Sequence, residues 1–242
     1  MKIVCIGAGP AGLYFAISAK VRDAGHEITV VERDPPGATY GWGVVYWDDL
    51  LDALYINDRE SAQRIRAAST VWQEQVVAIH GQRAYLNGYG YSVNRATLLD
   101  VLAQRAADLG VDVQYERAAD DLAEFSDADL VVIADGANSR TRQSMAEQFG
   151  TQLDQGDNPY LWLGTGRVFD KFTFGFEQTP QGWIWFHAYP SAAGVSTFIV
   201  ECQERTWRAL GFDELDDAAT TRLLEEVFDE HLAGHALISS AR

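Results

Sequence analysis

A glycine-rich turn placed directly after an apolar strand is the feature that most restricts the fold of this chain. The run "KIVCI" at residues 2–6 has the continuous apolar character of a strand buried on both faces. "GAGPAG" follows at residues 7–12, then helical spacing over 13–24 and a second apolar strand over 27–32. A strand, a tight turn, a helix and a strand in this order predict a βαβ unit with parallel strands.

The spacing of the glycines indicates a dinucleotide site. Gly7 permits the tight turn, Gly9 lets the backbone approach a pyrophosphate, and Gly12 lets the helix pack closely on the strand. The start of the helix presents unpaired N–H groups to the phosphates. Glu32, at the end of the second strand, is suited to accept hydrogen bonds from a ribose hydroxyl. The alternative is a glycine-rich turn without a ligand. The predicted contact residues of the turn are Gly7, Ala8, Gly9, Pro10, Ala11 and Gly12.

The rest of the chain predicts a second, antiparallel sheet. Periodicity, caps and turn residues give helices over 48–55, 58–68, 95–109, 139–149 and 213–232, and strands over 111–116 and 128–135, the latter fully buried. Alternating, aromatic-rich chain over 71–93 and four such segments between 159 and 200 predict antiparallel strands. We therefore expect an α/β fold in which a Rossmann-like domain that binds a dinucleotide, either FAD or NAD(P), is combined with an antiparallel sheet that forms a second lobe.

The expected boundaries are discontinuous. Residues 1–72 and 94–155 are assigned to the nucleotide-binding domain and residues 73–93 and 156–212 to the substrate lobe. Residues 213–242 are assigned to a C-terminal helix.

Composition narrows the class of partner. The 242 residues include 47% hydrophobic residues, enough for a sizeable core, and a formal net charge of −16 argues against nucleic acid as a partner. The apolar N-terminus is interrupted by Gly and Pro, so we expect neither a signal peptide nor a membrane span, and a cytoplasmic protein. Cys5 and Cys202 are expected to be buried free thiols. We expect no metal site, because His231 and His235 stand four apart without a third ligand.

The segment "GWIWFHAY" is the best candidate for a substrate wall. A period of two places Trp183, Trp185, His187 and Tyr189 on one face and Ile184, Phe186 and Ala188 on the other. The first face predicts a surface that binds an aromatic ring, with His187 and Tyr189 as its polar, candidate catalytic members. The alternative is a purely structural aromatic face.

Together with "GAGPAG" and Glu32-Arg33, two further motifs resemble the FAD-dependent aromatic hydroxylases, which are single-component flavoprotein monooxygenases. Arg95 stands in the first turn of a predicted helix, and Asp135-Gly136 ends a predicted strand. The resemblance implies that Arg33 and Arg95 contact FAD, and that Asp135 and Gly136 serve both FAD and NAD(P)H.

The loop "GWGVV" at residues 41–45 narrows the resemblance to a branch that acts on aromatic acyl-CoA thioesters or tryptophan derivatives. A loop after the second strand lies at the carboxyl edge of the sheet, where ligands bind. We therefore expect the backbone of Trp42, Gly43 and Val44 to pass close to a flat cofactor, with the indole of Trp42 as an aromatic wall.

The resemblance implies a complete reaction. NAD(P)H reduces FAD, and one oxygen atom of O₂ is transferred to an electron-rich aromatic ring. The protein orients the ring, excludes water and removes a phenolic proton, for which His187 is the candidate.

The resemblance implies that family members continue, downstream of the part that this chain covers, with a strand that ends in a Gly-Asp motif and is followed by a helix. We therefore expect either a fragment of a longer product or a truncated relative. A fragment would expose apolar surface, which favours a homodimer, and the chain should hold FAD weakly and turn over little. Two other functions stay open. One is a different FAD-dependent oxidoreductase, such as a prenyl-chain reductase or a halogenase, and the other is a non-catalytic nucleotide-binding module.

Overall fold

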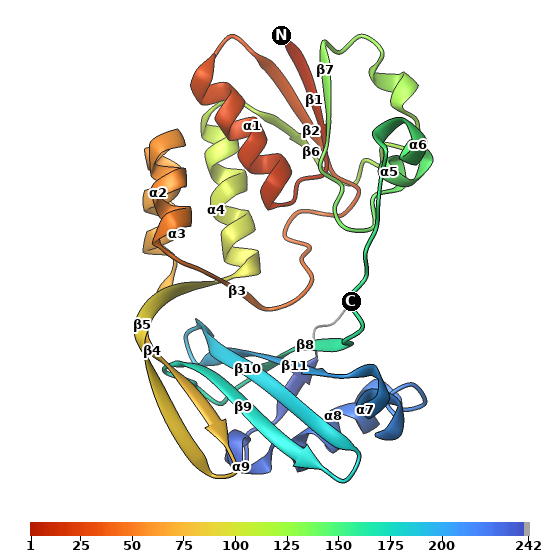
Figure 1. The fold of residues 1–242 in the computed structure, drawn as a ribbon. Helices are drawn as coiled ribbons and strands as arrows, with labels where there is room; N and C mark the ends of the chain where they lie inside the picture. Colours follow the sequence, from red (N-terminus) through yellow and green to blue (C-terminus); the bar gives the residue numbers. More distant parts are fainter. Residues whose placement is uncertain (240–242) are drawn as a thin grey trace. The chain divides into compact units, whose positions relative to one another are not determined.

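The computed structural model describes residues 1–239 and divides into two compact units (Figure 1). The first unit comprises residues 1–39, 49–68 and 96–154. The second comprises residues 40–48, 69–95 and the described chain from Gln155 onward. This division differs from the expected boundaries, because residues 40–48, 69–72, 94–95 and 155 and the described segment after residue 212 belong to the second unit.

A four-stranded parallel sheet forms the centre of the first unit. Its strands are, in spatial order, β6 (Asp112–Gln114), β2 (Glu27–Val31), β1 (Lys2–Ile6) and β7 (Leu130–Ile133). Its helical segments are α1 (Pro10–Arg22), most of α2 (Asp48–Asn57), α3 (Arg59–Ala67), α4 (Arg95–Asp108), the 3₁₀ helix η1 (Leu122–Phe125), α5 (Arg140–Ser144) and α6 (Ala146–Phe149). Cys5 on β1 and Ala16 and Ile17 on α1 are fully buried, which confirms the βαβ unit.

Two expectations for this unit were wrong in detail. The strand over 128–135 is not buried on both faces, because β7 is at the edge of the sheet and pairs only with β1 among the described strands. Leu130 is 40% exposed. The helix expected over 139–149 is broken at Met145 into α5 and α6, and Gly150 ends α6 in the left-handed conformation with φ of 60°.

A buried ion pair joins two helices of this unit. The carboxylate of Asp58 caps α3 by accepting from the backbone N–H of Ser61 at 3.1 Å, and it accepts from Arg105 of α4 through Nε at 2.9 Å and Nη2 at 2.8 Å. Burial by itself would raise the pKa of Asp58, but the hydrogen bonds from Arg105 and Ser61 prevail and lower this pKa to about 2.

An eight-stranded sheet forms the second unit. Its strands are, in spatial order, β12 (Leu237–Ser239), β8 (Tyr160–Thr165), β11 (Val195–Cys202), β10 (Gly182–Ala192), β9 (Phe172–Thr179), β4 (Thr70–Ile79), β5 (Gln82–Asn94) and β3 (Gly43–Tyr46). All neighbouring strands are antiparallel except β4 and β9, which pair in parallel. The predicted antiparallel lobe is thus confirmed as one continuous sheet.

Helices after the last long strand cover one face of this sheet. The segment predicted as one helix over 213–232 forms α8 (Asp217–Val227) and α9 (Asp229–Leu232), and the helix α7 (Glu204–Ala209) and strand β12 were not expected. Ile184, Phe186 and Ala188 of β10 are completely buried in a core shared with residues of α8 and α9. The alternation predicted for β10 is therefore confirmed on its core side. Within residues 1–239 there is no helix with the length and apolar character needed to cross a bilayer.

Candidate functional site

The glycine-rich turn of the first unit has the conformation that its spacing predicts. Gly7 has φ of +103°, and its N–H donates to the carbonyl of Val31 at 2.8 Å. A Cβ at Gly7 would lie 2.4 Å from the carbonyl oxygen of Ala134, and a Cβ at Gly12 would lie 1.9 Å from that of Gly7. Both positions therefore require glycine for the close packing of β1, α1 and the end of β7.

Gly9 differs from these two glycines. Its φ of −70° is open to other residues, and a Cβ there would meet no neighbouring atom within 4 Å. It is the N-cap of α1, with Pro10 and Ala11 as the first helical residues, and no side chain caps the helix. The first turn also contains no acidic residue. The N-terminus of α1 therefore presents backbone N–H groups, the positive end of the helix dipole and open space at Gly9.

Glu32 lies directly beside this turn. Its two carboxylate oxygens accept from the backbone N–H of Ala8 at 2.8 Å and from that of Asp34 at 2.9 Å. These bonds hold the carboxylate at the carboxyl ends of β1 and β2. Arg33 points differently, since its side chain is 62% exposed and approaches Asp34 at 3.8 Å.

The turn after β7 meets the turn after β1. The contact of Gly7 with Ala134 brings Asp135 and Gly136 to the same edge of the sheet, and Gly136 has φ of +90°. A pocket of about 330 Å³ opens here. Its lining residues are Ile133, Asp135, Gly136, Ser139, Arg142, Phe149 and Thr151.

Two polar atoms at this pocket lack a partner among the described residues. They are Oδ1 of Asp135 and Nε of Arg142, and both are buried. Ser139 caps α5 by accepting from the backbone N–H of Arg142 at 2.9 Å, and the guanidinium of Arg142 also donates to the carbonyl of Ala137. Two residues that line the same pocket thus have one unsatisfied acceptor and one unsatisfied donor, which is costly unless a ligand or water pairs with these atoms.

In the second unit, the loop 40–43 packs against the sheet. A Cβ at Gly41 would lie 2.5 Å from the ring of Trp162, and one at Gly164 would lie 2.6 Å from the ring of Trp42. The N–H of Gly43 donates to Oγ1 of Thr197 at 2.9 Å, and Val44 continues β3 opposite Val93. The glycines therefore allow close contact between the loop and strands β8 and β11.

Arg95 joins the same loop. Its backbone N–H donates to the carbonyl of Trp42 at 2.8 Å, and its guanidinium lies 5.7 Å from the ring centroid of Trp162. Nε of Arg95 and the indole nitrogens of Trp42 and Trp162 are buried without a hydrogen-bond partner in the described chain. Three donors with no acceptor of their own thus lie on neighbouring side chains.

His187 and Tyr189 stand in an aromatic row on the face of the sheet opposite the helices. The ring of Phe172 packs beside both, 5.9 Å from His187 and 5.3 Å from Tyr189, and is nearly parallel to both. Phe174 pairs with His187 across the strands. Burial lowers the pKa of His187, so its imidazole is neutral at pH 7 and can accept a proton.

Tyr189 has a different environment. Its hydroxyl donates to the carbonyl of Gly43 at 2.7 Å, and burial raises its pKa. This bond ties β10 to the loop 40–43. The two polar members of the predicted wall are therefore not equivalent. The hydroxyl of Tyr189 is hydrogen-bonded to the backbone, whereas the imidazole of His187 has no hydrogen-bond partner among the described residues.

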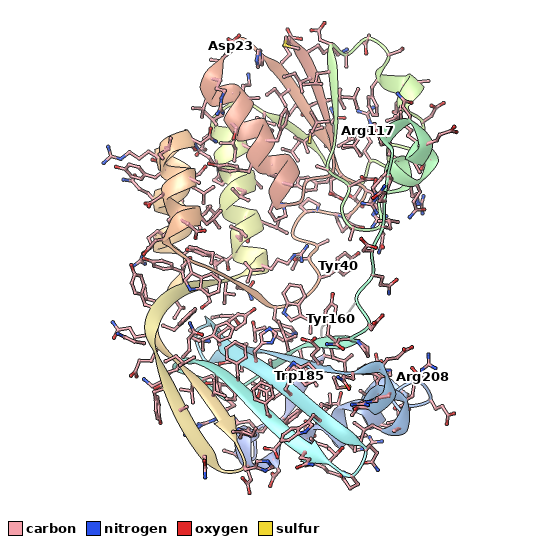
Figure 2. All side chains as sticks on the ribbon, viewed as in Figure 1. Asp23, Tyr40, Arg117, Tyr160, Trp185 and Arg208 are labelled. Carbon is pink, nitrogen blue, oxygen red and sulfur yellow. The ribbon has the colours of Figure 1, made fainter. Side chains whose placement is uncertain are left out.

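The two tryptophans of the predicted wall separate along β10. Trp185, labelled in Figure 2, stacks on Phe176 with ring centroids 6.3 Å apart. Trp183 lies at the strand end, is 37% exposed and contacts the ring of His80 edge to face at 5.3 Å. Sequence reasoning missed the contribution of β9, although the period-two spacing of Phe172, Phe174 and Phe176 could have placed them on this face.

Residues 1–239 contain no cluster of three or more His, Cys, Asp or Glu side chains that could hold a metal ion together. His231 pairs instead with Glu177 at 2.8 Å. Cys5 and Cys202 are buried and unpaired with each other, and burial raises their pKa values to about 12 and about 11.

Comparison with known proteins finds three monooxygenases or hydroxylases that each align with nearly the whole chain. Salicyloyl-CoA 5-hydroxylase of Streptomyces sp is 38% identical, and the alignment covers 99% of this chain and 48% of the relative. A 3-hydroxy-4-methyl-anthranilyl-(aryl-carrier protein) 5-monooxygenase of Streptosporangium sibiricum is 35% identical, and the alignment covers 99% of this chain and 64% of the relative. Protodeoxyviolaceinate monooxygenase of Chromobacterium violaceum is 32% identical, and the alignment covers 99% of this chain and 65% of the relative. The chain thus spans about half to two thirds of the length of these relatives.

The fold has close structural neighbours as well. The structure of 2-methyl-3-hydroxypyridine-5-carboxylic acid oxygenase superposes with a TM-score of 0.74 at 19% identity, covering 94% of this chain and 64% of that one. A family model described as "Lycopene cyclase protein" matches residues 2–154. The chain therefore belongs to the family of this model, which matches more than half of its residues. Nearly the whole chain also aligns with aromatic monooxygenases, in agreement with the resemblance of its motifs.

Proposed function

We propose that this chain forms the dinucleotide-binding unit and the aromatic-binding sheet of an FAD- and NAD(P)H-dependent monooxygenase that hydroxylates an aromatic ring. The observation that supports this most directly is the turn at Gly7–Gly12. Two of its glycines are required by packing, whereas Gly9 opens the N-terminus of α1 to solvent. An anionic diphosphate fits such a turn, because backbone N–H groups and the helix dipole favour negative charge there.

The residues of the first unit also fit the rest of the cofactor. Glu32, held in place by the N–H groups of Ala8 and Asp34, would accept a hydrogen bond from a ribose hydroxyl. The unsatisfied atoms of Asp135 and Arg142 would pair with polar groups of the nucleotide part. In the second unit, Arg95 would add a cation for an anionic group. When bound, the flavin would supply the activation of O₂ that side chains alone lack.

The second unit would orient the aromatic substrate. The row of rings on β9 and β10 provides an apolar surface, and His187 is the only member of the row with a titratable group near neutral pH. Its lowered pKa keeps the imidazole unprotonated at neutral pH, so Nδ1 or Nε2 is available to accept a phenolic proton and so raise the electron density of the ring. We assign this role to His187 rather than to Tyr189, because the hydroxyl of Tyr189 already binds the Gly43 carbonyl.

Two of the relatives suggest the form in which the ring is presented. Their names specify an aromatic acid joined to CoA or to an aryl-carrier protein. We therefore propose an aromatic acyl thioester as the first substrate class to test, and an indole compound as the second, since a third relative is named for protodeoxyviolaceinate.

The test of cofactor binding uses two glycines with matched surroundings. A Cβ at Gly9 and a Cβ at Gly156 both meet open space, so Gly9→Val and Gly156→Val should each leave folding almost unchanged. Titration with FAD, followed by quenching of flavin fluorescence, should show saturable binding by the wild type and by Gly156→Val and at least tenfold weaker binding by Gly9→Val. Equal affinity of all three proteins would remove the turn from the site.

A second assay separates the enzyme from its alternatives. NADH and NADPH consumption is measured with FAD, with and without an aromatic acyl thioester, and the products are analysed for an added oxygen atom. Hydroxylation that His187→Gln reduces would support the proposal. FAD binding without stimulated oxidation would favour a non-catalytic module, and conversion of a long hydrocarbon would favour an activity like that in the name of the family model.

A further inference from the structure

The outer part of strand β5 is a sheet edge with an unusual exposed surface. Strand β5 pairs with β4 over almost its whole length, but its other side pairs with β3 only at residues 91–94. Residues 82–90 therefore have one edge without a neighbouring strand in the described chain, and residues 82–89 are all exposed. Unpaired backbone N–H and C=O groups along such an edge are a template for another strand.

The side chains of this edge are apolar rather than protective. Tyr85, Leu86 and Tyr89 are 57%, 50% and 47% exposed. Proteins usually protect an exposed edge with Lys, Pro or inward-pointing charges. Residues 82–90 contain no Lys, no Pro and no carboxylate, and Arg83 is their single charged residue. The surface is therefore suited to pairing.

The charge distribution indicates which partner fits. The whole chain has a net charge of −16, so two copies repel each other over most of their surface. Residues 75–94 contain one cation and no carboxylate, and the neighbouring Glu74 is neutralised by Lys171 at 2.6 Å. This hairpin is thus a place where a second, equally acidic copy can approach with little repulsion.

We propose that a second copy of the chain pairs with this edge, strand β5 against strand β5, in an antiparallel two-fold arrangement centred on Leu86. In this register the Leu86 side chains of the two copies lie next to each other at the two-fold axis. Arg83 lies three positions from this axis in each copy. Arg83→Glu would therefore place two carboxylates at the joined edge and introduce the repulsion that its composition avoids.

The expected dimer is reversible. One pair of strands with three large side chains on each copy buries less than the roughly 1,600 Å² of a typical stable interface, so association should depend on protein concentration. The inference does not depend on the proposed function, because none of its residues belongs to the candidate cofactor or substrate site.

The test is sedimentation velocity of the full chain over a concentration series, with Leu86→Lys as the disrupting variant. Leu153→Lys is the matched control, because Leu153 is an apolar residue of the first unit that is 71% exposed. We expect wild type and Leu153→Lys to dimerise alike, Leu86→Lys to stay monomeric, and Arg83→Glu to weaken dimerisation at least tenfold. Circular dichroism should show all four proteins equally folded, since the substituted side chains are exposed.

Hydrogen exchange locates the interface independently. The amides of residues 82–90 should exchange more slowly as the concentration rises, while those of the edge strand β12 should not change. A wild type that stays monomeric throughout the series would overturn the proposal, and so would a dimer that Leu86→Lys leaves intact. Slower exchange confined to another segment would place the interface elsewhere and reject this edge.

Discussion

Replacing Asp58 with asparagine should destabilise the first unit through a charge effect that can be measured separately from helix capping. Asparagine caps a helix as well as aspartate does, so the cap of α3 is retained. What is lost is the charge that pairs with Arg105, and the side chains of Asp58 and Arg105 are only 6% and 17% exposed. Breaking a buried pair by removing one partner costs about 3–5 kcal/mol, and the partial exposure of Arg105 lowers this to about 2–3 kcal/mol.

The pKa of Asp58 predicts how this loss depends on pH. The pKa falls from 3.8 to about 2 on folding, which corresponds to about 2.5 kcal/mol at roughly 1.4 kcal/mol per pKa unit. A lowered carboxyl pKa contributes stability that is complete above the unfolded value and is lost as the pH falls through the folded value. The difference between wild type and Asp58→Asn should therefore be constant from pH 7 to about pH 4.5 and should shrink between about pH 4 and pH 2.

The assay is urea unfolding followed by circular dichroism at a series of pH values. Exchange rates of the amides of α3 and α4 identify the transition of the first unit. Asp127→Asn is the control, because Asp127 pairs with Lys2 on the surface, where the two side chains are 68% and 47% exposed. The control should leave the urea transition almost unchanged, because exposed ion pairs contribute little to stability. Equal losses for the two variants, or a loss for Asp58→Asn that does not change with pH, would refute the reasoning.

Three further predictions concern the candidate sites. Gly12→Ala should destabilise the first unit by at least about 2 kcal/mol, because the added Cβ would lie 1.9 Å from the carbonyl oxygen of Gly7. Urea unfolding measures this loss, and a transition that matches the wild type would contradict the close packing. Tyr189→Phe should cost about 1–2 kcal/mol in thermal unfolding, since the buried carbonyl of Gly43 loses its donor, and should leave hydroxylation in place. The free energy of unfolding should fall as the pH drops below about 6.5, because the unfolded chain binds a proton at His187 more readily than the folded chain does. His187→Gln should reduce the slope of the free energy of unfolding against pH in this range. An unchanged slope would argue against a neutral imidazole.

Several local features of the sequence were sufficient to predict their structures. The order strand, glycine turn, helix and strand specified a parallel βαβ unit, because the positions of Gly7 and Gly12 leave no room for a side chain. The period of two in β10 likewise separated Ile184, Phe186 and Ala188 from the aromatic face. Both signals are contained in short stretches of chain, where backbone geometry alone relates sequence spacing to direction.

Other features depended on contacts between distant segments. The edge position of β7 left a strand half exposed although its sequence is as apolar as that of a central strand, because neighbours and not composition determine burial. The contacts of Gly41 with Trp162 and of Gly43 with Thr197 join residues more than a hundred positions apart in the chain, so the sequence of the loop did not predict them. The use of the hydroxyl of Tyr189 as a donor to Gly43 could not be predicted for the same reason.

The sequence by itself thus determined the dinucleotide turn, the two kinds of sheet and the alternation along β10, since each follows from spacing within a few residues. Only the tertiary structure decided that β4 and β9 run in parallel, that His187 remains without a hydrogen-bond partner while Tyr189 is engaged, and that the edge of β5 is exposed among the described strands. These depend on register and burial between strands far apart in the chain, which local propensity does not encode.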